Sequence, residues 1–284
     1  MVGQRIIRVA VNGYGVIGKR VAQAVAVQKD MAVAGVADVA QDWRVRAALS
    51  RGYALYGATE EHAVAMGAAG LDVSGTLDDL LEAADIVVDC TPKHLASKNI
   101  ETYRRLGIRF IVHGGEKHQS TGHSFVAEAN YASAVGRDCT RVVSCNTTSI
   151  IRTLSALKRH GLLDRARGTL LRRATDPWES HQGGIMNTVV PEPEIPSHQG
   201  PDAQSVDPDL DVVTMAVKVP ETLAHLHYWS VQLTREASKD EVLDAFRTSS
   251  RIVFLRNIRD RTRNIFGGFC WLFIGGSIDL CTSR

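Results

Sequence analysis

The fold is decided by residues 6–18, which read IIRVAVNGYGVIG. The six mostly apolar residues at the start predict a buried strand, and a G-x-G-x-x-G pattern follows them directly. In a dinucleotide-binding fold, Gly13 would allow a tight turn, Gly15 would let the main chain approach the pyrophosphate, and Gly18 would let the next helix pack close to the strand. The alternative is a glycine-rich turn in an unrelated α/β protein.

The segments after the glycines favour the dinucleotide interpretation. A helical pattern runs from Lys19 to about Gln28, and an apolar strand pattern, 32–37, ends at Asp38. An acidic residue at the end of the second strand can bind the ribose hydroxyls of a dinucleotide. Its charge would repel the additional phosphate of NADP, so the local chemistry favours NAD.

Helix and strand patterns continue to alternate. The predicted elements are helices over 77–84 and 97–106 and strands over 85–90 and 109–112. This order predicts a doubly wound parallel sheet of the Rossmann type, whose ligands bind beyond the carboxyl ends of the strands. The glycine loop, Thr91-Pro92 and Gly114-Gly115 are therefore expected on one rim, beside Cys145.

The stretch SCNTT, residues 144–148, holds the candidate nucleophile. An apolar pair precedes it and apolar residues at helical spacing follow it, so Cys145 is expected where a strand ends and a helix begins. Free main-chain N–H groups and the positive end of the helix dipole favour a thiolate there. The alternative is a buried cysteine that only fills space.

Composition excludes several classes of function. The chain has 284 residues and a formal net charge of +2, so no broad attraction to nucleic acid is expected. Its five cysteines are odd in number and lack C-x-x-C spacing, which argues against a disulfide framework or a zinc site and predicts a reducing cytoplasm. We find neither a signal-peptide pattern nor an apolar run of about 18 residues, and expect no membrane segment.

The second half of the chain carries other chemistry. Seven of the eight prolines fall between Pro177 and Pro220, which predicts a long irregular excursion. Before it, a strand pattern ends in Arg172 and Arg173, whose side chains should point to opposite faces. A guanidinium suits a phosphate, so one interpretation is a phosphate clamp. The other is a solvated basic strand end.

Two further strands are predicted over 212–219 and 223–233. The second carries His225 and His227 on one face. One of them could act as general base for a cysteine. One alternative is a metal site with two histidines, but no third ligand lies at a suggestive spacing in the sequence. Another alternative is a buried histidine with a structural role. We therefore predict no metal site.

Eight segments together resemble the archaeal-type phosphorylating glyceraldehyde-3-phosphate dehydrogenases. They are NGYGVIGKRVA (12–22), DIVVDCTP (85–92), HGGEKH (113–118), RVVSCNTT (141–148), RRATDP (172–177), PSHQGPD (196–202), TMAV (214–217) and TLAHLH (222–227). The resemblance extends in order over about residues 4 to 253. The SCNTT and GGEKH segments are specific to this group.

The resemblance implies a two-domain enzyme, usually a homotetramer, that oxidises D-glyceraldehyde 3-phosphate with phosphate and NAD or NADP. The product is 1,3-bisphosphoglycerate, in glycolysis or gluconeogenesis. It implies a dinucleotide-binding domain over 1–143, an incomplete α+β catalytic domain with a mostly antiparallel or mixed sheet over 144–253, and an atypical tail over 254–284. By motif match, Cys145 is the nucleophile and His225 the general base.

The same match implies the remaining site residues. Those expected to bind substrate or phosphate are Ser144, Asn146, Arg172, His198 and Gln199. Those expected to bind the cofactor are Gly13, Gly15, Val16, Ile17, Gly18, Asp38, Gly115 and Arg173.

Three features depart from the family pattern. The family usually has two histidines where this chain has His198-Gln199, and because glutamine carries no charge we expect weaker phosphate binding. Relatives that use NADP often carry a lysine near Asp38, so both cofactors stay open. The likeness stops near Val253, and residues 254–284 hold four of the seven phenylalanines and two of the five cysteines. This predicts a frame-shifted or truncated C-terminus, and a chain that is unstable or nearly inactive as written.

Two rival functions remain on the sequence alone. A semialdehyde dehydrogenase would use a similar fold and a cysteine thioester on an amino-acid-derived substrate. A truncated relative could bind NAD without turnover.

Overall fold

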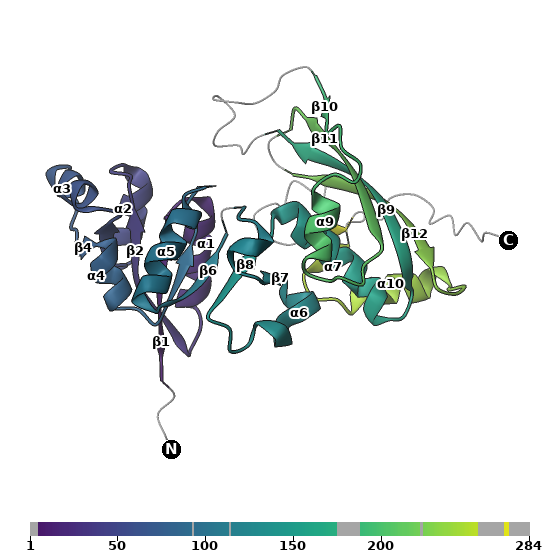
Figure 1. Ribbon diagram of the computed structural model, residues 1–284, viewed down its shortest axis with the longest axis horizontal. Coiled ribbons are helices and arrows are strands. Elements are labelled where there is room, and N and C mark those ends of the chain that lie inside the picture. The colour runs from purple at the N-terminus through teal and green to yellow at the C-terminus, as the bar shows by residue number, and fades with distance from the viewer. Residues whose placement is uncertain are drawn as a thin grey trace. The chain divides into compact units, whose positions relative to one another are not determined.

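The structure, a computed structural model, divides into two compact units (Figure 1). The residues described are 5–92, 94–113, 115–174, 188–221, 224–254 and 270–272. Unit 1 consists of Met1–Phe125 and Ala134–Val143, and unit 2 of Val126–Ser133 and Ser144–Arg284.

Unit 1 is built on a sheet of eight parallel strands in the order β4-β3-β2-β1-β5-β6-β8-β7. The strands are β1 (Ile7–Asn12), β2 (Met31–Asp38), β3 (Leu55–Gly57), β4 (Gly75–Thr76), β5 (Ile86–Asp89), β6 (Arg109–Val112), β7 (Ser124–Phe125) and β8 (Cys139–Val142). The reversal of strand order between β1 and β5 is that of a doubly wound sheet, so the predicted Rossmann-type architecture is confirmed.

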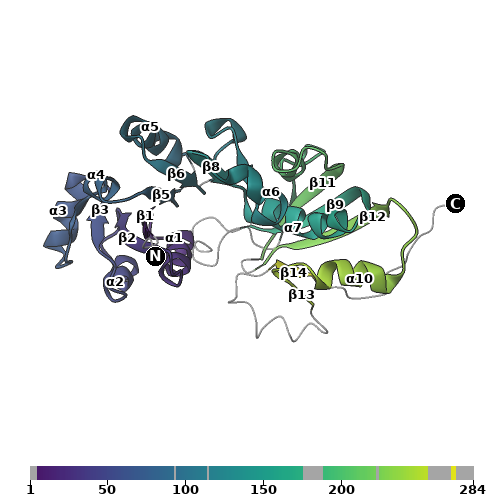
Figure 2. The same cartoon turned by 90° about the horizontal axis from the view of Figure 1, so that it is seen from below.

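Helices cover both faces of this sheet, as Figure 2 shows. They are α1 (Val16–Ala26), α2 (Trp43–Leu49), α3 (Glu60–Ala68), α4 (Leu77–Glu82) and α5 (Ala96–Leu106), with a short 3-10 turn η1 (His118–Ser120). Ala10 of β1 packs in one cluster with α4 and α5, whereas its neighbour Val11 packs in another with α1, α2 and α3. Successive strand residues thus bury opposite faces, which explains the nearly continuous apolar strands.

The glycine loop has the geometry that its sequence demands. Gly13 has φ +92°, and a Cβ there would lie 2.9 Å from the main-chain carbonyl of Cys90. A Cβ on Gly18 would lie 1.8 Å from the carbonyl oxygen of Gly13, so α1 can approach β1 only without a side chain at that position. By contrast, a Cβ on Gly15 would meet nothing within 4 Å. The first and third glycines therefore serve packing, and the second leaves open space above the turn.

A buried polar network fixes the ends of β1 and β5 beside this loop. Asp89 is fully buried, and its carboxylate accepts hydrogen bonds from the Tyr103 hydroxyl (2.7 Å), the Asn99 amide (2.8 Å) and the Thr91 hydroxyl (2.6 Å). Asn12 donates in turn to the Tyr103 hydroxyl at 2.8 Å. A buried carboxylate is tolerated only when it is bonded in this way, so the network holds two strand ends in register.

Unit 2 contains a mixed four-stranded sheet in the order β10-β11-β9-β12. Its elements are α7 (Cys145–Arg159), β9 (Leu163–Arg173), β10 (Val190–Pro191), α9 (Gln199–Gln204), β11 (Val212–Val219), β12 (Leu226–Leu233) and α10 (Lys239–Arg247). Helix α6 (Ala127–Ala134) lies at the division between the units, and β13 (Ile252–Phe254) pairs with β14 (Cys270–Leu272) in parallel. Alternate residues of β9 and β11 are buried under α7 and α9 (Figure 1).

Two sequence-based expectations change in unit 2. The strand expected over 223–233 begins only at Leu226, so that His225 lies just before it. Residues 222–223 are outside the described residues. The proline-rich stretch is not wholly irregular, since it contains β10 and α9. Apart from Phe254 and the backbone of 270–272, the tail expected over 254–284 lies outside the described residues.

The packing of α1 makes a testable prediction. Helix propensity favours alanine over glycine inside a helix, yet Gly18→Ala should destabilise unit 1 by about 3 kcal/mol or more, because the new Cβ meets main chain. Gly15→Ala is the matched control and should cost no more than about 1 kcal/mol, because it meets no other atoms and loses only a favourable N-cap residue. Denaturant unfolding followed by circular dichroism measures both. Equal stability of the two variants would contradict the prediction.

Candidate active site

Cys145 is the first residue of α7, as the sequence predicts. Strand β8 ends at Val142, and Ser144 caps the helix by accepting a hydrogen bond from the Thr147 N–H at 3.2 Å. The cysteine is exposed. Its sulfur therefore lies at a helix N-terminus, where unpaired N–H groups and the helix dipole stabilise negative charge.

A second contact holds this turn in place. The Thr147 hydroxyl, fully buried, bonds to the Ser144 hydroxyl at 2.9 Å and donates to the Asp202 carboxylate at 2.8 Å. Asp202 belongs to α9, so the start of α7 is tied to a helix more than fifty residues away in the chain. Ser144 thus acts on Cys145 through the helix cap in this structure.

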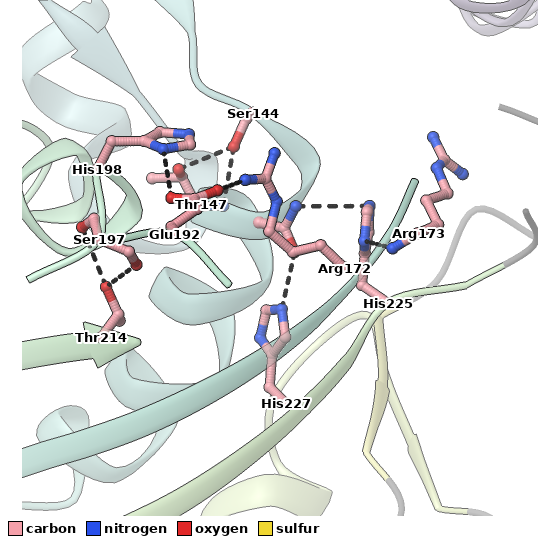
Figure 3. Close-up of polar contacts among 11 residues, drawn as sticks. Ser144, Thr147, Arg172, Arg173, Glu192, Ser197, His198, Thr214, His225 and His227 are labelled. Atoms are coloured by element: carbon pink, nitrogen blue, oxygen red, sulfur yellow. Dashed lines mark hydrogen bonds and ion pairs between the residues drawn. The ribbon is translucent and has the colours of Figure 1, made fainter. Parts of the chain in front are cut away.

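His225 lies beside the thiol. Its Nε2 is 3.3 Å from Sγ of Cys145. Its Nδ1 accepts the main-chain N–H of Arg173 at 3.2 Å (Figure 3). Burial and the nearby charge of Arg173 lower the pKa of His225 to about 3. The ring is therefore neutral near pH 7. Because Nδ1 is an acceptor, the proton is on Nε2 and is directed at the sulfur.

Asn146 links this histidine to the next one. Its Oδ1 lies 2.9 Å from His227 Nε2, and its Nδ2 lies 3.5 Å from His225 Nε2. Burial lowers the pKa of His227 to about 4, so this ring is also neutral and donates from Nε2. The bond fixes the Asn146 amide with its NH₂ group toward His225. The amide nitrogen of Asn146 thus lies next to the imidazole nitrogen that is 3.3 Å from the sulfur.

The residues expected to bind phosphate come together at the end of β9. Burial lowers the pKa of the Arg172 guanidinium. The nearby Cys145 side chain acts in the opposite direction, which places Arg172 close to the thiol. In the amide orientation that matches donors with acceptors, the Gln199 oxygen accepts from Arg172 at 3.0 and 3.2 Å and from His198 Nε2 at 3.2 Å. Arg172, His198 and Gln199 therefore form one cluster, as the resemblance implies.

The cluster has a fourth member that sequence reasoning did not find. Glu192 forms an ion pair with Arg172 and accepts from His198 Nδ1 at 3.1 Å. A lone acid between two prolines gives no signal of this contact. Figure 3 shows the Arg172 side chain directed toward Glu192 and the Arg173 side chain directed away from it, as expected for neighbours on a strand. The main-chain N–H of Arg173 contacts the site by donating to Nδ1 of His225.

Apart from Arg173, the residues expected to bind the cofactor lie in unit 1. Val16 and Ile17 begin α1 and are exposed, so the first N–H groups of the helix are open to an anion. The Asp38 carboxylate, at the end of β2, accepts the N–H of Tyr14 at 2.6 Å and those of Val39 and Ala40 at 2.8 Å. With the open turn at Gly15, these features fit the pyrophosphate and ribose of a dinucleotide.

Gly115, the remaining residue of the predicted cofactor set, follows β6 with φ +83°. Its N–H donates to the carbonyl oxygen of His113 at 2.9 Å, so it lies in a tight turn after the strand. Within the described residues, no group of three or more His, Cys, Asp or Glu side chains is arranged to hold a metal ion. Searching those residues for a helix able to cross a membrane also finds none.

Two family models match the chain. The C-terminal domain of glyceraldehyde 3-phosphate dehydrogenase matches residues 144–265, and the N-terminus of dihydrodipicolinate reductase matches residues 7–146. Among relatives, the glyceraldehyde-3-phosphate dehydrogenase of Methanothermus fervidus is 44% identical over 248 residues, which cover 87% of this chain and 73% of the relative. That of Thermococcus kodakarensis is 43% identical over 253 residues, covering 89% and 75%.

Solved structures share the fold at low sequence identity. Aspartate semialdehyde dehydrogenase II from Vibrio cholerae superposes with a TM-score of 0.63 at 13% identity, covering 89% of this chain and 82% of that one. Aspartate semialdehyde dehydrogenase with NADP from Candida albicans has a TM-score of 0.62 at 14% identity, covering 93% and 87%. At such identities the likeness extends to the fold alone.

The thiols differ in a way that alkylation can measure. Burial and the charge of Asp89 raise the pKa of Cys90 to about 12, whereas Cys145 is exposed beside His225. At pH 8, roughly one Cys90 thiol in ten thousand is ionised, so iodoacetamide should modify Cys145 at least about 100 times faster. Peptide mass spectrometry over time gives both rates. Comparable rates, or an unchanged fast phase in Cys145→Ser, would refute the assignment.

The buried histidines make stability depend on pH. Unfolded histidine titrates near 6.5, whereas folded His227 titrates at about 4, so between these values the unfolded chain binds the additional proton. The free energy of unfolding should therefore fall as pH falls from about 6.5 to 4. Urea unfolding across this range should show a shallower pH slope for His227→Asn than for the unsubstituted chain. Identical slopes would mean that His227 is not buried as a neutral ring.

Proposed function

This chain belongs to the glyceraldehyde-3-phosphate dehydrogenase family, and from that premise we propose that it oxidises D-glyceraldehyde 3-phosphate with phosphate, through a covalent intermediate on Cys145. It is an oxidoreductase of this type with a nicotinamide cofactor. The observation that carries the mechanism is the 3.3 Å contact between the Cys145 sulfur and His225 at the start of α7.

The first step forms a bond between sulfur and carbon. The Cys145 thiolate attacks the aldehyde carbon, and the carbonyl oxygen becomes an oxyanion of a thiohemiacetal. The Asn146 amide and the Nε2–H of His225 converge where that oxyanion develops. In the ring state described, His225 acts as hydrogen-bond donor. To act as the general base expected from the family, it would first have to give up the Arg173 N–H at Nδ1.

The second and third steps release the product. The cofactor, when bound, supplies an acceptor for the hydride that leaves the tetrahedral carbon, and a thioester remains on Cys145. Inorganic phosphate then attacks the thioester carbon, the carbon–sulfur bond breaks, and the thiolate returns as 1,3-bisphosphoglycerate departs. Arg172 and His198 supply donors to phosphate in this scheme, and Gln199 holds the Arg172 guanidinium through its amide oxygen.

We propose NAD as the preferred cofactor. The Asp38 carboxylate is held at the end of β2 by three main-chain N–H groups, so its charge stays at the position where NADP would carry its additional phosphate. The family resemblance supports a homotetramer that serves glycolysis or gluconeogenesis. The free thiols of Cys90, Cys139 and Cys145 support a location in the reducing cytoplasm.

One assay tests the proposal. We expect NADH formation from glyceraldehyde 3-phosphate only when phosphate is added, with NADP giving a lower kcat/KM. Cys145→Ser should abolish it. His225→Asn should lower kcat by roughly 100-fold or more, since it removes a donor at the oxyanion. His227→Asn should be milder, because His227 acts through Asn146.

The outcomes separate the rival functions. Turnover of aspartate semialdehyde in place of glyceraldehyde 3-phosphate would favour a semialdehyde dehydrogenase. Binding of NAD without any turnover, together with ordinary folding by circular dichroism, would favour a relative that has lost activity. Phosphate-independent turnover would contradict the acyl-phosphate product.

A further inference from the structure

Glu192 is held in place by main-chain pairing. It follows β10, and its N–H donates to the carbonyl oxygen of Ala216 at 2.8 Å, which extends the antiparallel pairing of β10 with β11. Its side chain is only 17% exposed, and the Arg172 side chain beside it is 20% exposed. The contact between Glu192 and Arg172 is therefore largely enclosed, whereas the His198 side chain is 63% exposed.

The carboxylate takes up the donors that a phosphate would use. One of its oxygens pairs with Nη1 of Arg172 and the other accepts from Nδ1 of His198 at 3.1 Å. A phosphate would be bound in a similar way, with one oxygen on the guanidinium and another on the imidazole. Figure 3 shows the glutamate side chain between these two groups.

We propose that Glu192 is an internal competitor for the phosphate group that binds at Arg172 and His198. This inference rests on the proposed function, since it takes the donors of Arg172 and His198 as the phosphate site. A phosphate group gains the Arg172 and His198 donors only when the carboxylate releases them. Glu192 thereby sets the affinity of the site for phosphate, whether that group belongs to inorganic phosphate or to the phosphorylated aldehyde.

The cluster does not need Glu192 to keep Arg172 in position. The Gln199 oxygen accepts from both Nη1 and Nε of Arg172, at 3.0 and 3.2 Å, and Gln199 is fully buried. Its amide nitrogen is in turn bonded to the Ser197 hydroxyl at 2.7 Å. Neutralising Glu192 should therefore free one face of Arg172 without releasing its side chain.

The test compares phosphate binding by three proteins. Inorganic phosphate is titrated by calorimetry into the full chain, into Glu192→Gln and into Glu194→Gln. Glu194 is exposed in the same segment, so its substitution removes the same charge without touching Arg172. We expect Glu192→Gln to bind phosphate about tenfold tighter, the change when a charge-assisted hydrogen bond stops competing. Glu194→Gln should match the unsubstituted chain, and Glu192→Asp should stay close to it.

The kinetic readout identifies the phosphate source. A lower KM for inorganic phosphate, with kcat little changed, supports competition with the attacking phosphate, whereas a lower KM for glyceraldehyde 3-phosphate supports competition with the substrate's own phosphate. Unchanged or weaker phosphate binding in Glu192→Gln overturns the proposal, as does an equal gain in Glu194→Gln. Should Glu192→Gln not fold, Glu192→Ala serves in its place. Tighter phosphate binding without turnover in any protein supports the competitor and refutes only the proposed function.

Discussion

The hydrogen bond from the Arg173 main-chain N–H to Nδ1 of His225 decides which chemistry the site can perform. It makes Nδ1 an acceptor, so the neutral ring carries its proton on Nε2, the atom 3.3 Å from the sulfur of Cys145. A positively charged ring would direct a second N–H at the Arg173 N–H. This conflict and burial both oppose protonation, in agreement with the pKa of about 3. Strand β9 thus sets which nitrogen of His225, the residue before β12, carries the proton that faces the Cys145 thiol on α7.

The sequence predicted the local elements well because their signals are local. Strands β6 and β11 have the bounds that apolar runs predicted, and Cys145 begins a helix as expected from SCNTT. Contacts between distant segments were not predictable in the same way. Only the family resemblance indicated that His225 would lie beside Cys145. The contact of Glu192 with Arg172 was not predicted, because an ion pair across twenty residues depends on how β9 and β10 align with β11.

In both units, buried polar groups hold the main chain in place, at strand ends in unit 1 and at a helix start in unit 2. In unit 1, Asp89 receives hydrogen bonds from three side chains and so fixes the strand ends behind the glycine loop. In unit 2, the buried Thr147 hydroxyl joins the cap of α7 to Asp202 of α9. Each group costs free energy if left unpaired, and therefore only one arrangement of its neighbours is stable. The reactive groups can then be exposed while the structure around them stays fixed.

The replacement of a second histidine by Gln199 is consistent with this principle. The Gln199 amide is fully buried against Arg172, which is itself partly desolvated. A second cation there would repel the guanidinium in a low dielectric, whereas an amide offers an oxygen to Arg172 and a nitrogen to Ser197. Because Glu192 supplies the balancing negative charge, Arg172 is neutralised from one side and held from the other. In the proposed function, phosphate would therefore bind by replacing the Glu192 carboxylate, rather than by entering a site with an uncompensated positive charge.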